Sequence, residues 1–205
     1  MITVGLDEVG RGCWAGPLVA GAVALPAEID DELRGLRDSK KLTKKHREVL
    51  AVSIQSHALA VGLGWVWPSE IDEHGLTWAV RTAMERAFSD IQISYDQIII
   101  DGNINYLSDN SKATAIIRAD NTVPAVSAAS IVAKVARDVY MNNLGDAYSG
   151  YGFDKHVGYG TPAHIAALKK LGVSDIHRLS YKPIAQILAR HFSVQANENQ
   201  ISNRV

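Results

Sequence analysis

Cysteine is nearly absent from this chain of 205 residues, because Cys13 is the only one. A single thiol cannot form an intramolecular disulfide, and it cannot build a metal site from thiolates. Both absences suit a reducing compartment, so we expect a cytoplasmic protein. No signal peptide is visible, and no apolar run is long enough to span a bilayer, so a membrane is not an expected partner.

An excess of charge of either sign is also lacking. The formal net charge is -1 and the pI is about 6.6, with 47% hydrophobic and 21% charged residues. This balance is typical of ordinary globular proteins. Bulk electrostatics therefore does not indicate a nucleic-acid partner. Such a partner would have to be held by a local basic patch or by metal ions.

Apolar runs and helical periodicity alternate along the chain. We expect strands over 2–7, 17–25, 57–66, 97–101 and 113–120. Helices are expected over 43–56, 69–88, 126–144 and 161–172, and from residue 183. This order favours an α/β fold, a mixed β-sheet flanked by helices, with a helical C-terminal lobe from about residue 145. One domain is expected over 1–192, followed by a polar tail at 193–205.

Three of the predicted strands lead into acids: Asp7 with Glu8, Asp101, and Asp120. Carboxylates brought together repel one another unless cations neutralise them, and hard oxygen ligands select Mg²⁺ or Mn²⁺. Two such ions about 3.5–4 Å apart can activate water and stabilise the leaving oxygen of a phosphodiester. The alternative is that each acid is a solvated turn residue. Asp7 and Glu8 can share a site only where their strand ends or bulges.

Several sequence blocks resemble the ribonuclease HII (type 2 ribonuclease H) family. They are DEVGRG (7–12), DSKKL (38–42), Asp101, RADNTVPAVSAASIVAKVARD (118–138) and GFDKHVGYGTPAH (152–164), and HRLSYKP (177–183) fits as well. The resemblance implies a ribonuclease H-like fold. It also implies an endonuclease that hydrolyses the RNA strand of RNA–DNA hybrids and cuts 5′ of single ribonucleotides in duplex DNA. The products would carry 3′-hydroxyl and 5′-phosphate ends.

The family's four metal-binding, catalytic acids match Asp7, Glu8, Asp101 and Asp120. Asp138 is a rival for the fourth place. Asp138 lies inside a predicted helix, where with Arg137 it would more often form a structural pair.

The resemblance also implies substrate-binding residues. A glycine-rich loop would recognise the ribose 2′-hydroxyl through its backbone, a tyrosine would pack on the sugar at the RNA–DNA junction, and basic residues would hold phosphates. These residues are Gly10, Arg11, Gly12, Tyr159, Ser39, Lys40, Lys41 and Arg178. Without the resemblance they would be a tight turn, a surface or core aromatic and a solvated charge cluster.

Cys13-Trp14 departs from a frequent family pattern, in which Pro and a smaller apolar residue follow the glycine-rich loop. The histidines at 156 and 164 are expected at helix ends or in solvent, and the tryptophans at 65, 67 and 78 in the core. A monomer is expected. Two rival functions remain open, a catalytically silent RNA–DNA binding protein and a metal-dependent phosphatase for small phosphate esters.

Overall fold

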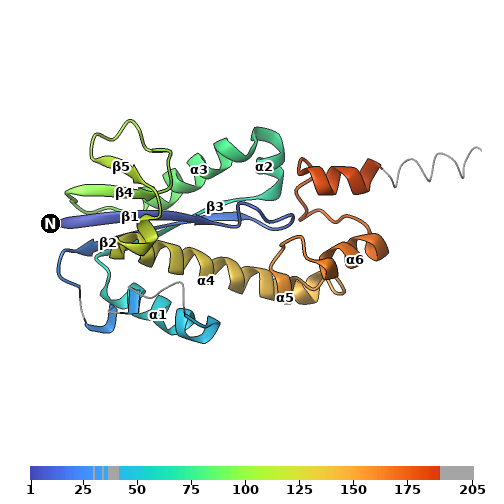
Figure 1. Ribbon diagram of the computed structural model, residues 1–205, viewed down its shortest axis with the longest axis horizontal. Helices are drawn as coiled ribbons and strands as arrows, with labels where there is room; N and C mark the ends of the chain where they lie inside the picture. Colours follow the sequence, from blue (N-terminus) through green and yellow to red (C-terminus); the bar gives the residue numbers. More distant parts are fainter. Residues whose placement is uncertain (30, 34, 37–41, 190–205) are drawn as a thin grey trace, which may run out of the picture.

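The computed structural model describes residues 1–29, 31–33, 35–36 and 42–189. Its centre is a mixed β-sheet of five strands (Figure 1). The strand order is β3-β2-β1-β4-β5. The strands are β1 (Ile2–Val9), β2 (Leu18–Pro26), β3 (Ala60–Val66), β4 (Gln97–Asp101) and β5 (Ala113–Ile116). β2 pairs antiparallel with both β1 and β3, whereas β4 runs parallel to β1 and β5 runs parallel to β4. The expected mixed sheet flanked by helices is confirmed.

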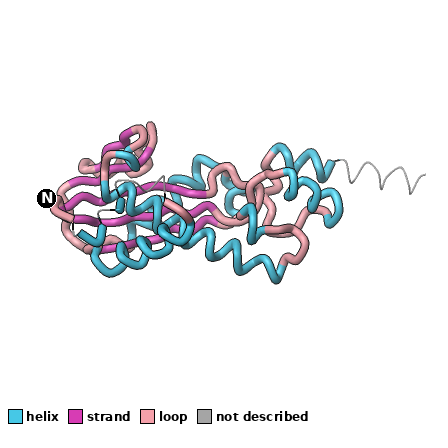
Figure 2. The backbone as a smooth tube through the Cα atoms, turned by 60° about the horizontal axis from the view of Figure 1, so that its bottom comes forward, coloured by secondary structure: helices cyan, strands magenta, loops and turns pink. Residues whose placement is uncertain are grey.

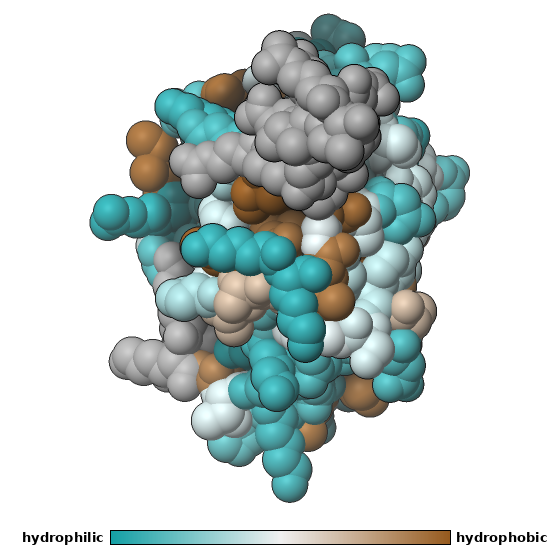
Figure 3. Space-filling model, turned by 90° about the vertical axis from the view of Figure 1, so that its right-hand side faces the viewer, coloured by the Kyte–Doolittle hydropathy of each residue, from teal (hydrophilic) through white to brown (hydrophobic). Residues whose placement is uncertain are grey.

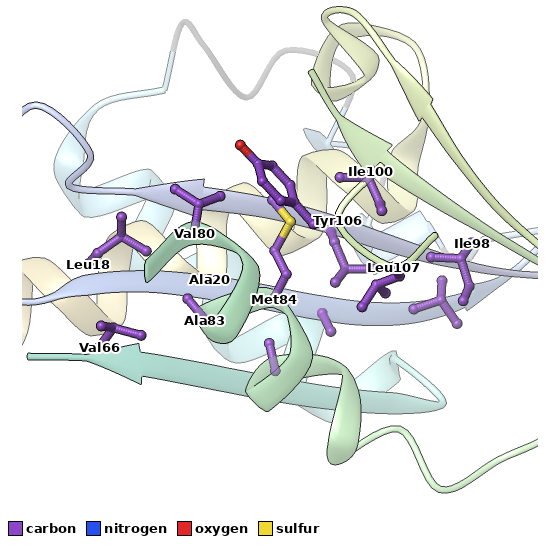
Figure 4. Packing of buried hydrophobic residues seen from close by; sticks show 14 of the residues in the cluster. Leu18, Ala20, Val66, Val80, Ala83, Met84, Ile98, Ile100, Tyr106 and Leu107 are labelled. Atoms are coloured by element: carbon purple, nitrogen blue, oxygen red, sulfur yellow. The ribbon is translucent and has the colours of Figure 1, made fainter. Parts of the chain in front are cut away.

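Helices cover both faces of this sheet (Figure 1). One face carries α2 (Pro68–His74) and α3 (Leu76–Ser89), and the other carries α1 (Lys44–His57) and α4 (Pro124–Ala147). Because both faces are covered, β2 is a continuous apolar run that is buried through Leu25. Figure 4 shows Val80 and Met84 of α3 over Leu18 and Ile100 of the sheet.

Close helix packing depends on bare backbone in the strands. A Cβ atom added at Gly5 of β1 would overlap the backbone of Ala125 and Val126 in α4. On the opposite face, a Cβ at Gly64 of β3 would overlap the carbonyl of Ala83 in α3. Only glycine lets the helix axes approach the sheet this closely.

Two predicted elements differ from the structure. The helix expected over 69–88 is two helices, because Gly75 adopts φ +82° and interrupts the helical backbone. The strand expected over 113–120 ends at Ile116. The chain then turns through Arg118, which has a left-handed φ of 58°, into the 3-10 turn η2 (Ala119–Asn121). Asp120 therefore lies in a turn beyond the strand.

The C-terminal lobe lies beyond the end of the sheet (Figures 1 and 2). It contains α5 (Phe153–His156), α6 (Pro162–Leu171) and a helix at 182–189. The helix expected over 161–172 is confirmed as α6: the side chain of its N-cap Thr161 accepts a hydrogen bond from the backbone of His164, and Gly172 follows its last residue. Seen from this end, hydrophobic side chains gather in the middle of the face (Figure 3).

Some expectations lie outside the described residues. Ser39, Lys40 and Lys41 are among them, as is the polar tail at 193–205. Within the described chain, the structure contains no helix of sufficient length and apolarity to cross a bilayer.

Candidate active site

Asp7 and Asp101 lie side by side towards the carboxyl-terminal ends of the neighbouring parallel strands β1 and β4. In the parallel pairing of β1 with β4, Leu6 is opposite Ile100, so the next residue of each strand reaches the same level. Gly5 faces α4, and Ile99 packs against Val126 of the same helix. Because side chains alternate along a strand, both acids project from the α4 face.

Asp7 is a largely buried carboxyl group, 8% exposed. Burial raises its pKa to about 7, and the nearby charges of Glu8 and Asp101 act in the same direction. A hydrogen bond from Ser130 of α4 and one from the Glu8 backbone N–H, at 2.8 Å, oppose the rise. Removing solvent from this carboxyl therefore favours a bound proton or a bound cation near neutral pH.

Glu8 leaves the opposite face of β1. The register is regular through Val9, with Asp7 opposite Gly21 and Glu8 opposite Ala20, so the strand contains no bulge there. β1 instead runs past Asp101, the last residue of β4. Burial raises the pKa of Glu8, the Arg11 guanidinium at 3.5 Å lowers it, and the charge of Asp101 raises it. Asp101 thus acts electrostatically on both acids of β1.

Asp101 has an orphaned oxygen. Its Oδ1 atom is buried and has no hydrogen-bond partner among the described residues. A buried acceptor without a partner costs about 1–3 kcal/mol, and more when it is charged. An all-oxygen donor set with an unsatisfied carboxylate oxygen fits a hard divalent cation.

Asp120 lies in the turn η2, which is fixed to β4 through its neighbours. Ala119 is fully buried against Ile99, two residues before Asp101, and Gly102 donates a hydrogen bond of 3.0 Å to the carbonyl of Ile116. A cavity of about 360 Å³ opens here, lined by Leu36, Asp120, Asn121, Thr122, Val123, Pro124 and Ser127. Among the residues that the structure describes, no three His, Cys, Asp or Glu side chains are already grouped so that they could hold a metal ion.

The rival acid, Asp138, has a basic partner. Its Oδ1 atom lies 2.7 Å from the Lys134 ammonium group, one turn earlier on α4. The expected pair with Arg137 is not what forms. Arg137 is instead fully buried and donates to the carbonyl oxygens of Pro17, Val157 and Ala15 at 2.8, 2.8 and 3.1 Å. Sequence reasoning did not find Arg137 as a support of the glycine-rich loop, although it lies in the sequence blocks described above.

The glycine-rich loop at residues 10–12, which was expected to recognise the ribose 2′-hydroxyl, is a tight turn packed on the side chain of Arg137. Gly10 has φ +84°, where a Cβ would overlap the Arg137 guanidinium, and its carbonyl accepts from Cys13 N at 3.2 Å. Arg11 is half exposed, with 53% of its side-chain surface accessible. A Cβ at Gly12 would meet nothing within 4 Å, so the outer side of this turn is open.

Arg178 does not lie on the surface where a phosphate contact was expected. It is fully buried, and its guanidinium donates to Gly16 O at 3.0 and 2.9 Å, to Arg11 O at 3.2 Å and to the Tyr181 hydroxyl at 2.9 Å. Through these bonds, Arg178 holds the backbone of Arg11 and Gly16 in position. Its burial argues against direct contact with a substrate phosphate.

Tyr159 is brought next to the glycine-rich loop although about 150 residues separate the two in sequence. Trp14 N donates to Gly158 O at 2.8 Å, and the Tyr159 side chain remains 41% exposed. Burial and the neighbouring Cys13 thiol raise the pKa of Tyr159. The phenol is therefore protonated at neutral pH and presents part of its ring to solvent.

Of the two expected places for the histidines, the helix ends are confirmed: His156 is the last residue of α5 and His164 lies in the first turn of α6. Neither lies in solvent, since both are buried, as is His177. The Nε2 atoms of His164 and His177 lie 3.0 Å apart, and the His156 and His164 rings stack at 4.4 Å. Burial lowers the pKa of both His164 and His177 to about 4, so both are neutral at pH 7.

The tryptophan expectation holds only in part. Trp65 and Trp78 are partly buried, but Trp67 is 41% exposed and stacks on Trp65 with the ring centroids 6.0 Å apart.

Comparison with known proteins agrees with this geometry. The family model described as Ribonuclease HII matches residues 4–184. The chain is 46% identical over 184 residues to Ribonuclease HII of Nitrosococcus oceani, covering 90% of each protein. It is 46% identical over 193 residues to Ribonuclease HII of Nitratidesulfovibrio vulgaris, covering 89% of this chain and 87% of the relative. The crystal structure of ribonuclease H2 from Pyrococcus horikoshii matches with a TM-score of 0.80 and 28% identity, covering 93% of this chain and 98% of that one. The chain therefore belongs to the ribonuclease HII family and is a ribonuclease H.

Proposed function

We propose that the chain hydrolyses the RNA strand of RNA–DNA hybrids and also cuts 5′ of single ribonucleotides embedded in duplex DNA, leaving 3′-hydroxyl and 5′-phosphate ends. The proposal extends family membership to a particular substrate and bond. The observation that carries it is the linked set of acids at the end of β1 and β4. Asp7 is buried, Asp101 has an unsatisfied oxygen, and the charge of Asp101 acts on both Asp7 and Glu8.

The proposed metal ligands are Asp7, Glu8, Asp101 and Asp120, and the proposed ions are two Mg²⁺ or Mn²⁺ ions. Bound divalent cations supply Lewis acidity that lowers the pKa of water and stabilises negative charge on a leaving oxygen. These carboxylates would hold the ions, and the buried, unpartnered Oδ1 atom of Asp101 is an acceptor that a cation would satisfy. The charges of both Glu8 and Asp101 act on Asp7, and we propose Asp7 as the ligand that both ions would share.

Recognition of the ribose is assigned to the turn at residues 10–12. Its open outer side and glycine backbone allow main-chain groups to approach a sugar, and the 2′-hydroxyl is the group that distinguishes RNA from DNA. The half-exposed ring of Tyr159 would pack on the sugar at the junction. The phosphate contacts of Ser39, Lys40 and Lys41 remain predictions. A cytoplasmic monomer with one domain over 1–192 is also part of the proposal.

The test is cleavage of an end-labelled DNA duplex that contains one ribonucleotide, mapped to the nucleotide, with Mg²⁺ or with EDTA. We expect one cut on the 5′ side of the ribonucleotide with Mg²⁺ and none with EDTA. Replacement of Asp7 or Asp101 with Asn should remove most turnover while substrate binding persists. Wild-type rates in either variant would refute these assignments.

Two matched variants decide the fourth acid. Asp120→Asn should remove turnover, whereas Asp138→Asn should retain it, because Asp138 is paired with Lys134 on α4. The opposite result would assign the place to Asp138. Binding of the hybrid without any Mg²⁺-dependent cut would favour the silent binding protein. Hydrolysis of a simple phosphate ester with the hybrid left intact would favour the phosphatase.

A further inference from the structure

Trp14 joins the glycine-rich turn to the loop at residues 158–160. Its backbone N–H donates to Gly158 O at 2.8 Å, and the N–H of Ala15 reaches the same oxygen at 3.4 Å. The Trp14 indole lies directly against Gly160, where an added Cβ would overlap the ring atoms. Two segments far apart in the sequence are thus fixed to each other by the residues that follow the turn.

The backbone of Tyr159 is also held from the other side. Its carbonyl oxygen accepts from Thr161 N at 2.8 Å and lies 2.9 Å from Nδ1 of the buried His164. Its own N–H donates to His156 O at 2.9 Å. With the backbone fixed on both sides, the remaining freedom of Tyr159 is rotation of its side chain.

Cys13 supplies the contact that restricts this rotation. It is fully buried, and its thiol lies near enough to the Tyr159 hydroxyl for each group to act on the pKa of the other. The bond from Cys13 N to Gly10 O, at 3.2 Å, fixes the same residue to the turn that is proposed to read the 2′-hydroxyl. One residue therefore contacts both the turn and the phenol, while 41% of the Tyr159 side chain stays exposed.

We propose that Cys13 and Trp14 are positioning residues that set the Tyr159 ring relative to the glycine-rich turn, so that discrimination in favour of an RNA–DNA junction depends on the Cys13 thiol. This inference rests on the proposed function. It assigns a role to the two residues by which the chain departs from the frequent family pattern at these positions.

The physical reason is the cost of a misplaced ring. A contact between an aromatic side chain and a sugar depends on the position of the ring, and a shift of about 1 Å in a positioning group can strongly reduce the rate of reaction. Removing the thiol leaves the Tyr159 hydroxyl free to turn toward solvent, whereas a serine hydroxyl at the same position can still bond to it. Cleavage of phosphodiester bonds within a long RNA–DNA hybrid, where there is no RNA–DNA junction, should not depend on this contact.

The first experiment compares kcat/KM for a duplex with one ribonucleotide against kcat/KM for a long RNA–DNA hybrid, in wild type, Cys13→Ala, Cys13→Ser and Tyr159→Phe. We expect Cys13→Ala to lower the ratio by about two- to tenfold, the effect of losing one polar contact. Cys13→Ser should restore most of the ratio. Tyr159→Phe combined with Cys13→Ala should lower the ratio no further than either change alone.

Loss of activity on both substrates in equal proportion would overturn the proposal, since a merely structural fault would act that way. An unchanged ratio in Cys13→Ala, or additive effects in the double variant, would overturn it as well. Trp14→Leu provides a second variant if Cys13→Ala does not fold. It should lower the same ratio, because the smaller side chain no longer packs on Gly160.

A second readout needs no catalysis. Cys13 is the only cysteine, so the rate at which a thiol reagent labels the protein in EDTA reports on opening of this contact alone. Labelling should be slow, faster in Tyr159→Phe, and slower with the single-ribonucleotide duplex than with an all-DNA duplex. Identical rates with both duplexes would count against the inference even in an active enzyme. If wild type cuts neither substrate, the proposed function fails, yet a faster rate in Tyr159→Phe would still establish the contact.

Discussion

Lowering the pH should destabilise the protein through its buried histidines and stabilise it through Asp7. The pKa of His164 and of His177 is lowered from 6.5 to about 4 by burial, so the unfolded chain binds more protons between these values. Their contribution to stability is complete above pH 6.5 and is lost as the pH falls. From pH 7 to pH 5, each histidine should remove about 2 kcal/mol from the free energy of unfolding.

Asp7 acts with the opposite sign. Burial raises its pKa from 3.8 to about 7, so the folded chain binds more protons between these values. Its contribution is complete below pH 3.8 and is lost as the pH rises through 7. Between pH 7 and pH 5, protonation of Asp7 should return about 2 kcal/mol to the metal-free protein. The wild type should therefore lose about 2 kcal/mol over this interval and Asp7→Asn about 4 kcal/mol.

Urea unfolding in EDTA at pH 7 and at pH 5 measures both quantities. The decisive number is the difference between the two proteins, because the histidines and Glu8 are present in both. Equal losses in wild type and Asp7→Asn would refute a buried, proton-binding Asp7. If Asp7→Asn loses no stability at pH 5, the account of the neutral histidine cluster is refuted.

Two further predictions concern packing. Arg178→Met should lower the free energy of unfolding by about 2–4 kcal/mol, because it leaves buried carbonyl oxygens of Gly16 and Arg11 without a donor. Urea unfolding measures this loss, and an unchanged midpoint would contradict the support role. Gly64→Ala should cost about 1–3 kcal/mol by forcing a methyl group against Ala83 O, whereas Gly12→Ala, which faces open space, should leave the melting temperature unchanged. Equal melting temperatures for these two variants would contradict the prediction, because they would show that α3 moves away from β3 at no cost in stability.

The parts of the fold that follow from local pattern could be predicted from the sequence. The apolar runs of β1 and β4 end beside acids, and parallel strands bring such ends to one edge, as found for Asp7 and Asp101. The N-cap at Thr161 and the glycine after α6 needed only neighbouring residues. The break at Gly75 was missed because the apolar stripe continues into α3 without showing the change in backbone direction.

Features that depend on distant partners could not be predicted in this way. The burial of His164 depends on His177 and Phe153, and no local pattern indicates that these rings meet. Arginine is a residue type that often binds phosphate, but the Arg178 side chain instead bonds to carbonyl oxygens more than 160 positions earlier in the sequence. The left-handed turn at Arg118, which moves Asp120 off the end of β5, is unusual for a residue other than glycine.

The contact of Gly5 with α4 fixes the position of this helix relative to the strand that carries Asp7. Gly5 lies two residues before Asp7, and the same helix carries Ser130, which bonds to Asp7, and Arg137, which holds residues 15–17. A methyl group at Gly5 would act as a wedge that tilts α4 away from the sheet. A single added carbon would then displace both the hydrogen-bond partner of Asp7 and the residue that holds Ala15 and Pro17.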